Sequence, residues 1–480
     1  MLIYLDRLLR RGALLLAVLC SACAAPAAAL PTPVASVPAP PASPTLAASP
    51  TLAASPAALP TLTPVPTPVP GGLYVNPAMP LGTISLLMYG TNIGPWDGIP
   101  FGMQPQIAAA GLSLFRFPGG NYGDQFDLTP DQVDAYLALC QQLKVEPLIS
   151  ARLLGGTPAQ AAALVRYVNI TRHAHVRYWS IGNEPNLYAS TNSIAYDTQR
   201  FNREWRAMAL AMRASDPQIV LLGPELSQFD AQGGPRDAAG RPWMDSFLQA
   251  NGDLVDIVTF HRYPFPSRPT DPDPGVDQLR ASSSEWDTLI PALRAMMRAD
   301  LRRTLPIGVT ELNSSWNASF SGDATPDSLP GAIWLGDVLA RLIRQQVTIT
   351  AQFAIYAPGH DGWGMVESYA VRPAYYVYQL YHHLGSQLIY SSSDEPMLSI
   401  VATRQRDASL VLLVVNRSAQ PISTALRIAG IHPAAAVQTW RLDSTHLAAA
   451  SGTITPGSGQ PVLFPGESIT VLQVATPAHS

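Results

Sequence analysis

The feature that most constrains the fold is an alternation of short apolar runs with longer amphipathic segments between residues 83 and 384. Strands that alternate with helices form parallel sheets, because a parallel pair of strands needs a crossover connection. Eight such units over about 300 residues predict a (β/α)8 barrel, and the main alternative is a doubly wound open sheet. The runs with the length and side-chain content of buried strands are Thr83–Tyr89, Ser113–Phe117, Glu146–Ser150, Val176–Ile181, Ile219–Leu222, Ile257–His261, Ile307–Thr310 and Thr350–Tyr356.

The segments between these runs carry helix signals. Two of them, starting at Thr129 and Thr157, have a capping threonine, a proline at the first helical position and a glutamine three residues after the cap. Further helices are predicted over Tyr196–Ala214, Ser284–Arg302, Pro330–Gln345 and Pro373–Leu384.

Beyond Gly385 no helical stripe remains, and short strands alternate with turn residues, which predicts an all-β sandwich. The segment before the first barrel strand is a candidate edge strand of this sandwich. We therefore expect a barrel over residues 73–385 and a smaller sandwich over 386–480. The predicted sandwich strands are Ser399–Thr403, Leu410–Asn416, Ser423–Ile428, Val437–Leu442 and Ser468–Val474.

The N-terminus predicts export. Arginines precede the apolar run Gly12–Leu19, and small residues follow it, which is the order of a secretory signal over residues 1–24. The run is shorter than the roughly 20 apolar residues that a membrane helix needs. Two outcomes remain open. One is cleavage after the Ala-x-Ala motif Ala22–Ala24, and the other is acylation of Cys23 in a sequence similar to a bacterial lipoprotein box.

Residues 25–72 are almost entirely Pro, Ala, Thr, Ser, Val and Leu. A segment of this composition cannot form a core, so it predicts an extended spacer. We expect an extracellular or cell-surface protein, which is attached to a membrane only if Cys23 is acylated.

Charge and cysteine content exclude several classes. The net charge of -4 argues against a nucleic-acid partner held by bulk positive charge. Cys20 and Cys23 lie in the signal region, which leaves Cys140 without a disulfide partner in the folded part. Cys140 falls on an apolar helical stripe with Val133 and Leu137, so we expect a buried, inert thiol.

No serine-hydrolase elbow, zinc-protease helix, phosphate loop or dinucleotide fingerprint occurs in the sequence, so no cofactor is expected. The pairs His173/His175 and His382/His383 have no acidic cluster nearby, and we expect them to be surface or loop histidines without a metal.

Two glutamates end apolar strands. Glu184 follows the strand Val176–Ile181, and Glu311 follows Ile307–Thr310. The carboxyl ends of barrel strands share one face, where the active sites of such barrels lie. Because burial disfavours a carboxylate, two of them at matching strand ends predict a functional pair.

The motifs Gly182-Asn183-Glu184-Pro185 and Thr310-Glu311 resemble the acid/base and nucleophile strands of the retaining glycoside hydrolases of clan A, which are built on a (β/α)8 barrel. The resemblance covers about residues 81–384. Three further features of the sequence are similar to features of the same clan. The first of those given next is similar to a motif of the α-L-arabinofuranosidases. These matches are Arg116-Phe117-Pro118-Gly119-Gly120-Asn121, His261-Arg262-Tyr263 and a candidate sugar-stacking aromatic, Trp363.

The resemblance implies a role for each residue. Glu184 would be the general acid/base and Glu311 the nucleophile of a double displacement, with carboxyl groups about 5 to 5.5 Å apart. Arg116 and Tyr263 would hold Glu311 as an anion, and Asn183 would donate to the sugar 2-hydroxyl. Asn121, His261 and Trp363 would complete the substrate site.

The sugar stays open at this stage. Arabinofuranosidases usually carry a substrate-binding glutamate just after the first strand, but Tyr89–Ile93 contains no acid. The motif Asn183-Glu184-Pro185-Asn186 is more similar to the corresponding motif of β-xylosidases, β-glucuronidases and glucanases. The competing function is a noncatalytic carbohydrate-binding surface protein on a decayed barrel, and the oligomeric state is not predicted.

Overall fold

The computed structural model describes residues 67–266, 271–317, 323–357, 362–430, 436–456 and 460–475. The predicted signal, Cys23 and all but the last residues of the predicted spacer lie outside the described residues. No helix in the described ranges combines the length and apolar character required of a membrane span.

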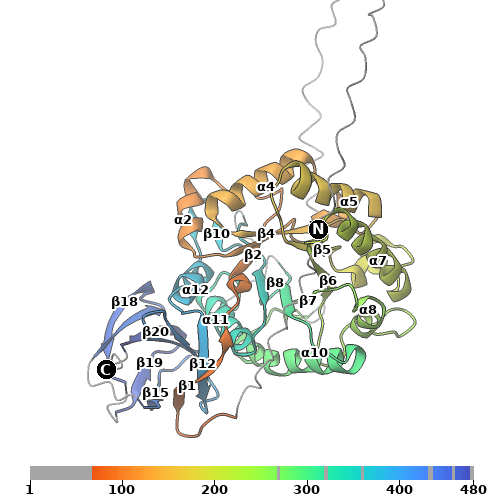
Figure 1. Cartoon of the computed structure of the whole chain (residues 1–480). Coiled ribbons are helices and arrows are strands. Elements are labelled where there is room, and N and C mark those ends of the chain that lie inside the picture. The colour runs from red at the N-terminus through yellow and green to blue at the C-terminus, as the bar shows by residue number, and fades with distance from the viewer. Residues whose placement is uncertain are drawn as a thin grey trace, which may run out of the picture. The chain divides into compact units, whose positions relative to one another are not determined.

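Within the described residues, eight parallel strands close into a barrel (Figure 1). Each strand pairs in parallel with the next, and the last pairs with the first. This closure confirms the predicted (β/α)8 barrel and rules out the open doubly wound sheet. The strands are β2 (Gly90–Asn92), β3 (Leu114–Phe117), β4 (Glu146–Ala151), β5 (Tyr178–Ile181), β6 (Val220–Ser227), β7 (Ile257–Arg262), β8 (Ile307–Leu312) and β9 (Ile349–Gln352).

The first barrel strand was predicted wrongly at Thr83–Tyr89. Ser85 instead caps a short 3-10 helix over Leu86–Met88 by accepting a hydrogen bond from the Leu87 amide at 3.2 Å. A short apolar run cannot be assigned to strand or helix by periodicity alone. The strand starts at Gly90, where a Cβ atom would collide with the Thr350 carbonyl of β9.

Helices connect the strands and pack on the outside of the barrel (Figure 1). In α4 both bonds of the capping box at Thr129 and Gln132 are present, and Thr157 caps α5 through its side chain. The helices are α2 (Gln104–Ala109), α3 (Tyr122–Gln125), α4 (Pro130–Leu143), α5 (Pro158–Val165), α6 (Tyr188–Asn192), α7 (Thr198–Ser215), α8 (Trp243–Asn251), α9 (Val276–Ser282), α10 (Trp286–Leu301), α11 (Leu329–Arg344) and α12 (Pro373–Tyr381).

The remaining strands form an eight-stranded sheet of order β16-β1-β12-β13-β14-β20-β17-β18 and two pairs, β15-β19 and β10-β11. The sheet is the predicted all-β domain. Its strands and the pairs are β1 (Leu73–Thr83), β10 (Val366–Glu367), β11 (Ala370–Val371), β12 (Gln387–Ser393), β13 (Leu398–Arg404), β14 (Leu410–Asn416), β15 (Ile422–Thr424), β16 (Leu426–Ile428), β17 (Val437–Leu442), β18 (Leu447–Ile454), β19 (Val462–Phe464) and β20 (Ser468–Val474).

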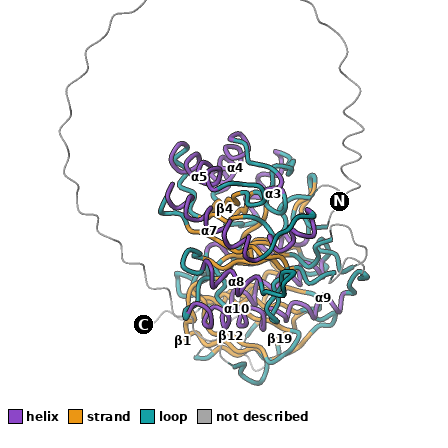
Figure 2. The backbone as a smooth tube through the Cα atoms, turned by 90° about the vertical axis from the view of Figure 1, so that its right-hand side faces the viewer, coloured by secondary structure: helices purple, strands orange, loops and turns teal. Residues whose placement is uncertain are grey.

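Two strands of this domain differ from the expectation. Residues 73–83, which fall within the expected barrel range, form β1 and join the sandwich, as expected of the segment before the first barrel strand. This strand is internal and not an edge strand, because it pairs with β12, beside which both views place it (Figures 1 and 2), and with β16 on its other side. The run Ser423–Ile428 is not one strand, because β15 pairs with β19 while β16 pairs with β1. Both differences arise from long-range pairing, which the pattern of a single run does not contain.

Helix α11 joins the barrel to the sandwich. Most of its residues are buried all around the helix, and a Cβ atom on Gly336 would collide with Ile469 of β20. Asp337 on the same helix is fully buried and forms an ion pair with Arg341 at 2.7 Å and with Arg417 of the sandwich at 3.3 Å. Close packing and buried charge therefore hold the two domains together in the described part of the chain.

Candidate active site

Glu184 and Glu311 lie at the same end of the barrel. Glu184 follows β5 in a left-handed conformation (φ 51°), and its amide donates to the Glu225 carbonyl at 2.9 Å. Glu311 is the fifth residue of β8 and is 6% exposed. One carboxylate oxygen of each glutamate and one ring nitrogen of His261 lie within 4.8 Å of one another.

His261 lies between the two glutamates. Its Nδ1 is 3.1 Å from Glu184 Oε1 and 3.8 Å from Glu311 Oε2. His261 therefore bridges the two glutamates, one oxygen of each of which lies within 4.8 Å of the other.

Two further side chains hold Glu311. The Tyr263 hydroxyl donates to its Oε1 at 2.6 Å, and Arg116 Nη1 donates to its Oε2 at 3.0 Å. Burial and the Glu311 carboxylate raise the pKa of Tyr263 well above its ordinary value, so Tyr263 keeps its proton and acts as a donor. The two contacts fix the orientation of the Glu311 carboxyl group, one at each oxygen.

Arg116 is the centre of the polar network. It is fully buried, and it donates from Nη1 to Asn92 and from Nη2 to Asn183, both at 2.8 Å. Burial opposes its charge, but Glu225 and Glu311 outweigh this and raise the pKa of Arg116. A guanidinium in this position is a permanent cation beneath the two glutamates.

Asn183 and Asn121 belong to the same network. Asn183 Nδ2 donates to Asn121 Oδ1 at 2.9 Å, and the Asn183 amide donates to Asp124 at 2.9 Å. Burial raises the pKa of Asp124 to about 6. The side-chain oxygen of Asn183 accepts from Arg116, so contact with a sugar hydroxyl is left to Nδ2, and this role stays a prediction.

The two glycines before Asn121 make room for this network. A Cβ atom on Gly119 would lie 2.8 Å from the Cβ of Asn92, and Gly120 has a φ of +60°, which disfavours other residues. Asn92 ends the first barrel strand, and its Nδ2 donates to the Thr310 carbonyl at 3.1 Å. The sequence reasoning missed Asn92, since it looked only for an acid there.

Glu225 is the second residue that the sequence reasoning missed. The predicted strand Ile219–Leu222 was too short, since β6 continues to Ser227. Glu225 is fully buried and forms ion pairs with Arg116 Nη2 at 2.9 Å and His261 Nε2 at 3.1 Å. The rule that identified Glu184 and Glu311, an acid where a barrel strand ends, would have found it.

The charges of His261 and Glu225 depend on each other. Burial disfavours a charged His261, but Glu311, Glu184 and Glu225 outweigh this and raise its pKa to about 9. Burial likewise opposes an ionised Glu225, but Arg116 and His261 outweigh this and lower its pKa to about 2. At neutral pH, His261 is therefore an imidazolium that donates from both nitrogens.

This protonation bears on metal binding. Among the described residues, Glu184, His261 and Glu311 are the three ligand-type side chains close enough to share an ion. An imidazolium has no lone pair to offer a metal. The exposed His173 and His175 belong to no such group in the described ranges.

Trp363 lies in the loop after β9. Its Nε1 donates to the Ser315 carbonyl at 2.9 Å, and its ring meets Phe353 edge-on at 5.3 Å. The ring is half-buried, and its stacking on a sugar stays a prediction. Cys140 is buried as expected, and burial raises its thiol pKa to about 12.

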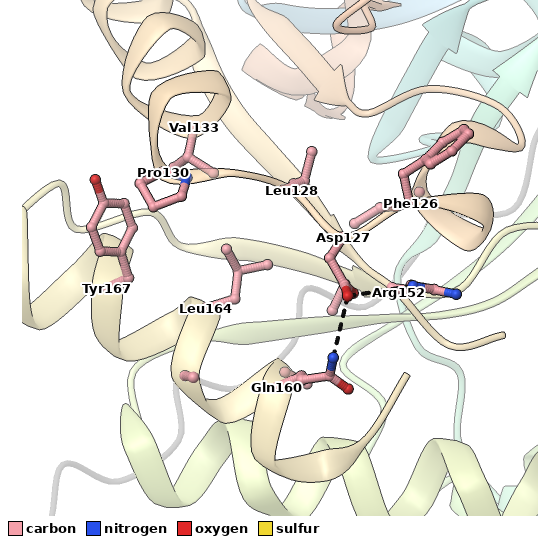
Figure 3. A pocket seen from close by; sticks show the side chains of 14 residues that line it. Phe126, Asp127, Leu128, Pro130, Val133, Arg152, Gln160, Leu164 and Tyr167 are labelled. Atoms are coloured by element: carbon pink, nitrogen blue, oxygen red, sulfur yellow. Dashed lines mark hydrogen bonds and ion pairs between the residues drawn. The ribbon is translucent and has the colours of Figure 1, made fainter. Parts of the chain in front are cut away.

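A cavity of about 330 Å³ lies apart from these residues, between α4 and α5 (Figure 3). Phe126, Leu164 and Tyr167 line it together with Asp127, which pairs with Arg152 at 3.4 Å. None of the candidate site residues lines this cavity.

Comparison with known proteins gives structural but not sequence matches. No family model matches the chain, and no curated protein matches it. An α-L-arabinofuranosidase from Thermotoga maritima in complex with arabinose has a TM-score of 0.66 at 18% identity, over 84% of this chain and 99% of that one.

Two other solved structures are similar to the same extent. A family 51 arabinofuranosidase from Xanthomonas axonopodis pv. citri has a TM-score of 0.65 at 16% identity, over 84% of this chain and 100% of the other. A family 44 xyloglucanase from Paenibacillus polymyxa has a TM-score of 0.66 at 15% identity, over 84% and 99%. The chain therefore has the fold of these clan A glycoside hydrolases, a (β/α)8 barrel with a β-sandwich.

Proposed function

We propose that this protein is a retaining glycoside hydrolase that cleaves O-glycosidic bonds of oligosaccharides or polysaccharides. The observation that carries the proposal is the pair Glu184 and Glu311, whose carboxylate oxygens approach within 4.8 Å at the carboxyl end of the barrel strands. The similar solved structures are glycoside hydrolases, which supports the same class of reaction.

In the first step, Glu311 attacks the anomeric carbon as the bond to the leaving oxygen breaks, and Glu184 gives its proton to that oxygen. Tyr263 and Arg116 keep Glu311 ionised before the attack. The product is a glycosyl ester on Glu311, and Glu184 is left as a carboxylate beside the His261 imidazolium.

In the second step, Glu184 takes a proton from a water molecule, whose oxygen attacks the anomeric carbon. The ester bond breaks, Glu311 leaves as a carboxylate, and Glu184 is again protonated. Two inversions at the same carbon give net retention of configuration.

For the substrate, we propose an arabinofuranoside or a xyloside of plant or microbial polysaccharide. Asn92 occupies the place where the arabinofuranosidase glutamate is expected. It donates to main-chain carbonyls and accepts from Arg116, so it is engaged within the protein. Chain-length analysis of the products released from xylan, arabinan and glucuronoxylan will separate the two sugars and distinguish exo from endo action.

The test of the reaction is chemical rescue. Glu311→Ala should abolish turnover of aryl glycosides, and added azide should restore it with a glycosyl azide of inverted configuration. Asp253→Ala is the matched control, because Asp253 forms an exposed pair with Arg206 and such pairs contribute about 0.5 kcal/mol. Sugar binding without turnover of any glycoside by the unaltered protein would instead identify the noncatalytic binding protein.

We also propose that the chain is exported by its first 24 residues and held from a cell surface by residues 25–72. The order of charged, apolar and small residues supports this. Labelling with an alkyne fatty acid in a bacterial host tests the lipid anchor. Label lost in Cys23→Ser and kept in Cys20→Ser supports it, and an unlabelled, released protein contradicts it.

A further inference from the structure

We infer that Glu225 is a positioning residue whose fixed negative charge keeps the site electrically balanced through both steps of the reaction. The inference rests on the proposed function, since it assigns a task within that reaction. Glu225 itself is fully buried and is not a group that touches the sugar.

The contacts of Glu225 reach all parts of the site. Its Oε2 pairs with both cations, Arg116 Nη2 at 2.9 Å and His261 Nε2 at 3.1 Å. Its Oε1 accepts from the Thr310 hydroxyl at 3.0 Å, next to Glu311. Its backbone carbonyl accepts from the Glu184 amide at 2.9 Å.

The backbone at Glu225 has an uncommon conformation. Its φ is +57°, in the left-handed region that residues other than glycine, asparagine and aspartate rarely adopt. Such a conformation persists where the surroundings enforce it, often at functional sites.

The charges balance in both resting and intermediate states. The proposed mechanism starts from a protonated Glu184 and an ionised Glu311, so with Arg116 and His261 positive and Glu225 negative the five charges sum to zero in the free enzyme. In the glycosyl ester, Glu311 is neutral and Glu184 is negative. The negative charge thus moves from one side of His261 to the other while the total of these five groups stays zero.

Without Glu225 the same groups would carry an excess positive charge in both states. An excess cation favours the ionised form of Glu184, which then no longer serves as an acid, or expels the proton from His261. The other charged or titratable groups around this centre in the described residues are Arg116 on β3, Glu184 after β5, Tyr263 after β7 and Glu311 on β8.

The test compares Glu225→Gln, which keeps the shape and removes the charge, with Thr310→Val, which removes one hydrogen bond to the same carboxylate and no charge. In Glu225→Gln, the alkaline limb of the kcat/KM pH profile on an aryl glycoside should move to lower pH by about one unit or more. The activity on the alkaline side then falls about tenfold. Thr310→Val should leave the position of the limb unchanged.

Glu225→Asp keeps the charge, so the alkaline limb of this variant should lie close to that of the unaltered protein. If Glu225 had only a structural role, Glu225→Asp would be impaired as well, since its shorter side chain leaves a gap. Thermal unfolding and circular dichroism show whether each variant is folded.

A second readout uses the unaltered protein. ¹⁵N-histidine NMR should show His261 with both nitrogens protonated from pH 5 to 8, and His261 titrating near pH 6.5 would overturn the inference. An unshifted limb in folded Glu225→Gln would also overturn it, while azide rescue of Glu311→Ala would still support the proposed reaction. Failure of that rescue would instead refute the proposed function.

Discussion

Asp337→Asn is the substitution whose effect on stability follows most directly from the structure. Asp337 is fully buried in α11, pairs with Arg341 and Arg417, and accepts a hydrogen bond from the Ser399 hydroxyl. Asparagine has nearly the same volume, so the change removes charge and little packing. It also leaves the two arginines, which are 7% and 5% exposed, without their shared anion.

The magnitude follows from the pKa of this carboxyl group. Burial opposes its charge, but Arg341 and Arg417 outweigh this and lower the pKa from 3.8 to about 2. One unit corresponds to about 1.4 kcal/mol, so ionisation stabilises the fold by roughly 2 to 3 kcal/mol. Removing one partner of a buried ion pair costs about 3 to 5 kcal/mol, which sets the upper end. Because the unfolding entropy grows with chain length, we expect Tm to fall by roughly 2 to 6 °C at pH 7.

The pH dependence has a definite sign. Because the folded pKa lies below the unfolded one, the stabilisation is complete above about pH 4 and is lost as the pH falls through about 2. The Tm difference between the unaltered protein and Asp337→Asn should therefore be constant from pH 7 to 5 and shrink from pH 4 towards 2.

Thermal unfolding by circular dichroism over this pH range measures both quantities. Asp127→Asn is the control, because Asp127 is 54% exposed in its pair with Arg152 and such surface pairs contribute at most about 1 kcal/mol. A Tm within 1 °C of the unaltered protein at pH 7 would refute the reasoning, as would a difference that grows on acidification.

Two further predictions concern the site. Tyr263→Phe removes the 2.6 Å hydrogen bond to Glu311, and since bonds to charged groups contribute about 1.5 to 3 kcal/mol, kcat/KM on an aryl glycoside should fall roughly 10- to 150-fold. A fall of less than about threefold would contradict this. Gly119→Ala places a Cβ 2.8 Å from Asn92 and should lower both Tm and activity by displacing the side chain that orients Arg116. Gly98→Ala, which meets nothing within 4 Å, should change neither.

The barrel could be predicted from the sequence because its signal is repeated and local. Each strand from Ser113–Phe117 onward is a short apolar run followed by a helix with its own cap or stripe, and the observed β3 to β9 coincide with those runs to within a few residues, except where β6 extends further. The failures have the opposite origin. Strand β1 was expected at the edge of the sandwich, but it lies between β12 and β16, both more than 300 residues later, and no local pattern contains those partners.

The two candidate catalytic glutamates could be found for the same reason, since each stands where an apolar strand ends. Glu225 was missed because it lies beyond the predicted end of its strand at Leu222, whereas β6 continues past that point with an irregular register against β7. Asn92 was missed because no local sequence pattern marks it. Its role becomes visible only through its contact with Arg116 in the folded protein.

Arg116 forms ion pairs with two carboxylates, and this arrangement explains the role of Glu225 beside Glu311 in the proposed site. Under the proposed mechanism, Glu311 must be ionised before the attack and must then give an electron pair to the anomeric carbon. An arginine paired only with Glu311 would bind the carboxylate strongly in the ground state. Catalysis needs interactions that are stronger in the transition state than in the ground state. In this protein Nη2 of Arg116 is paired with Glu225, and Nη1 is shared between Glu311 and Asn92. Glu225 therefore limits the hold of Arg116 on the nucleophile while it keeps the cation in place.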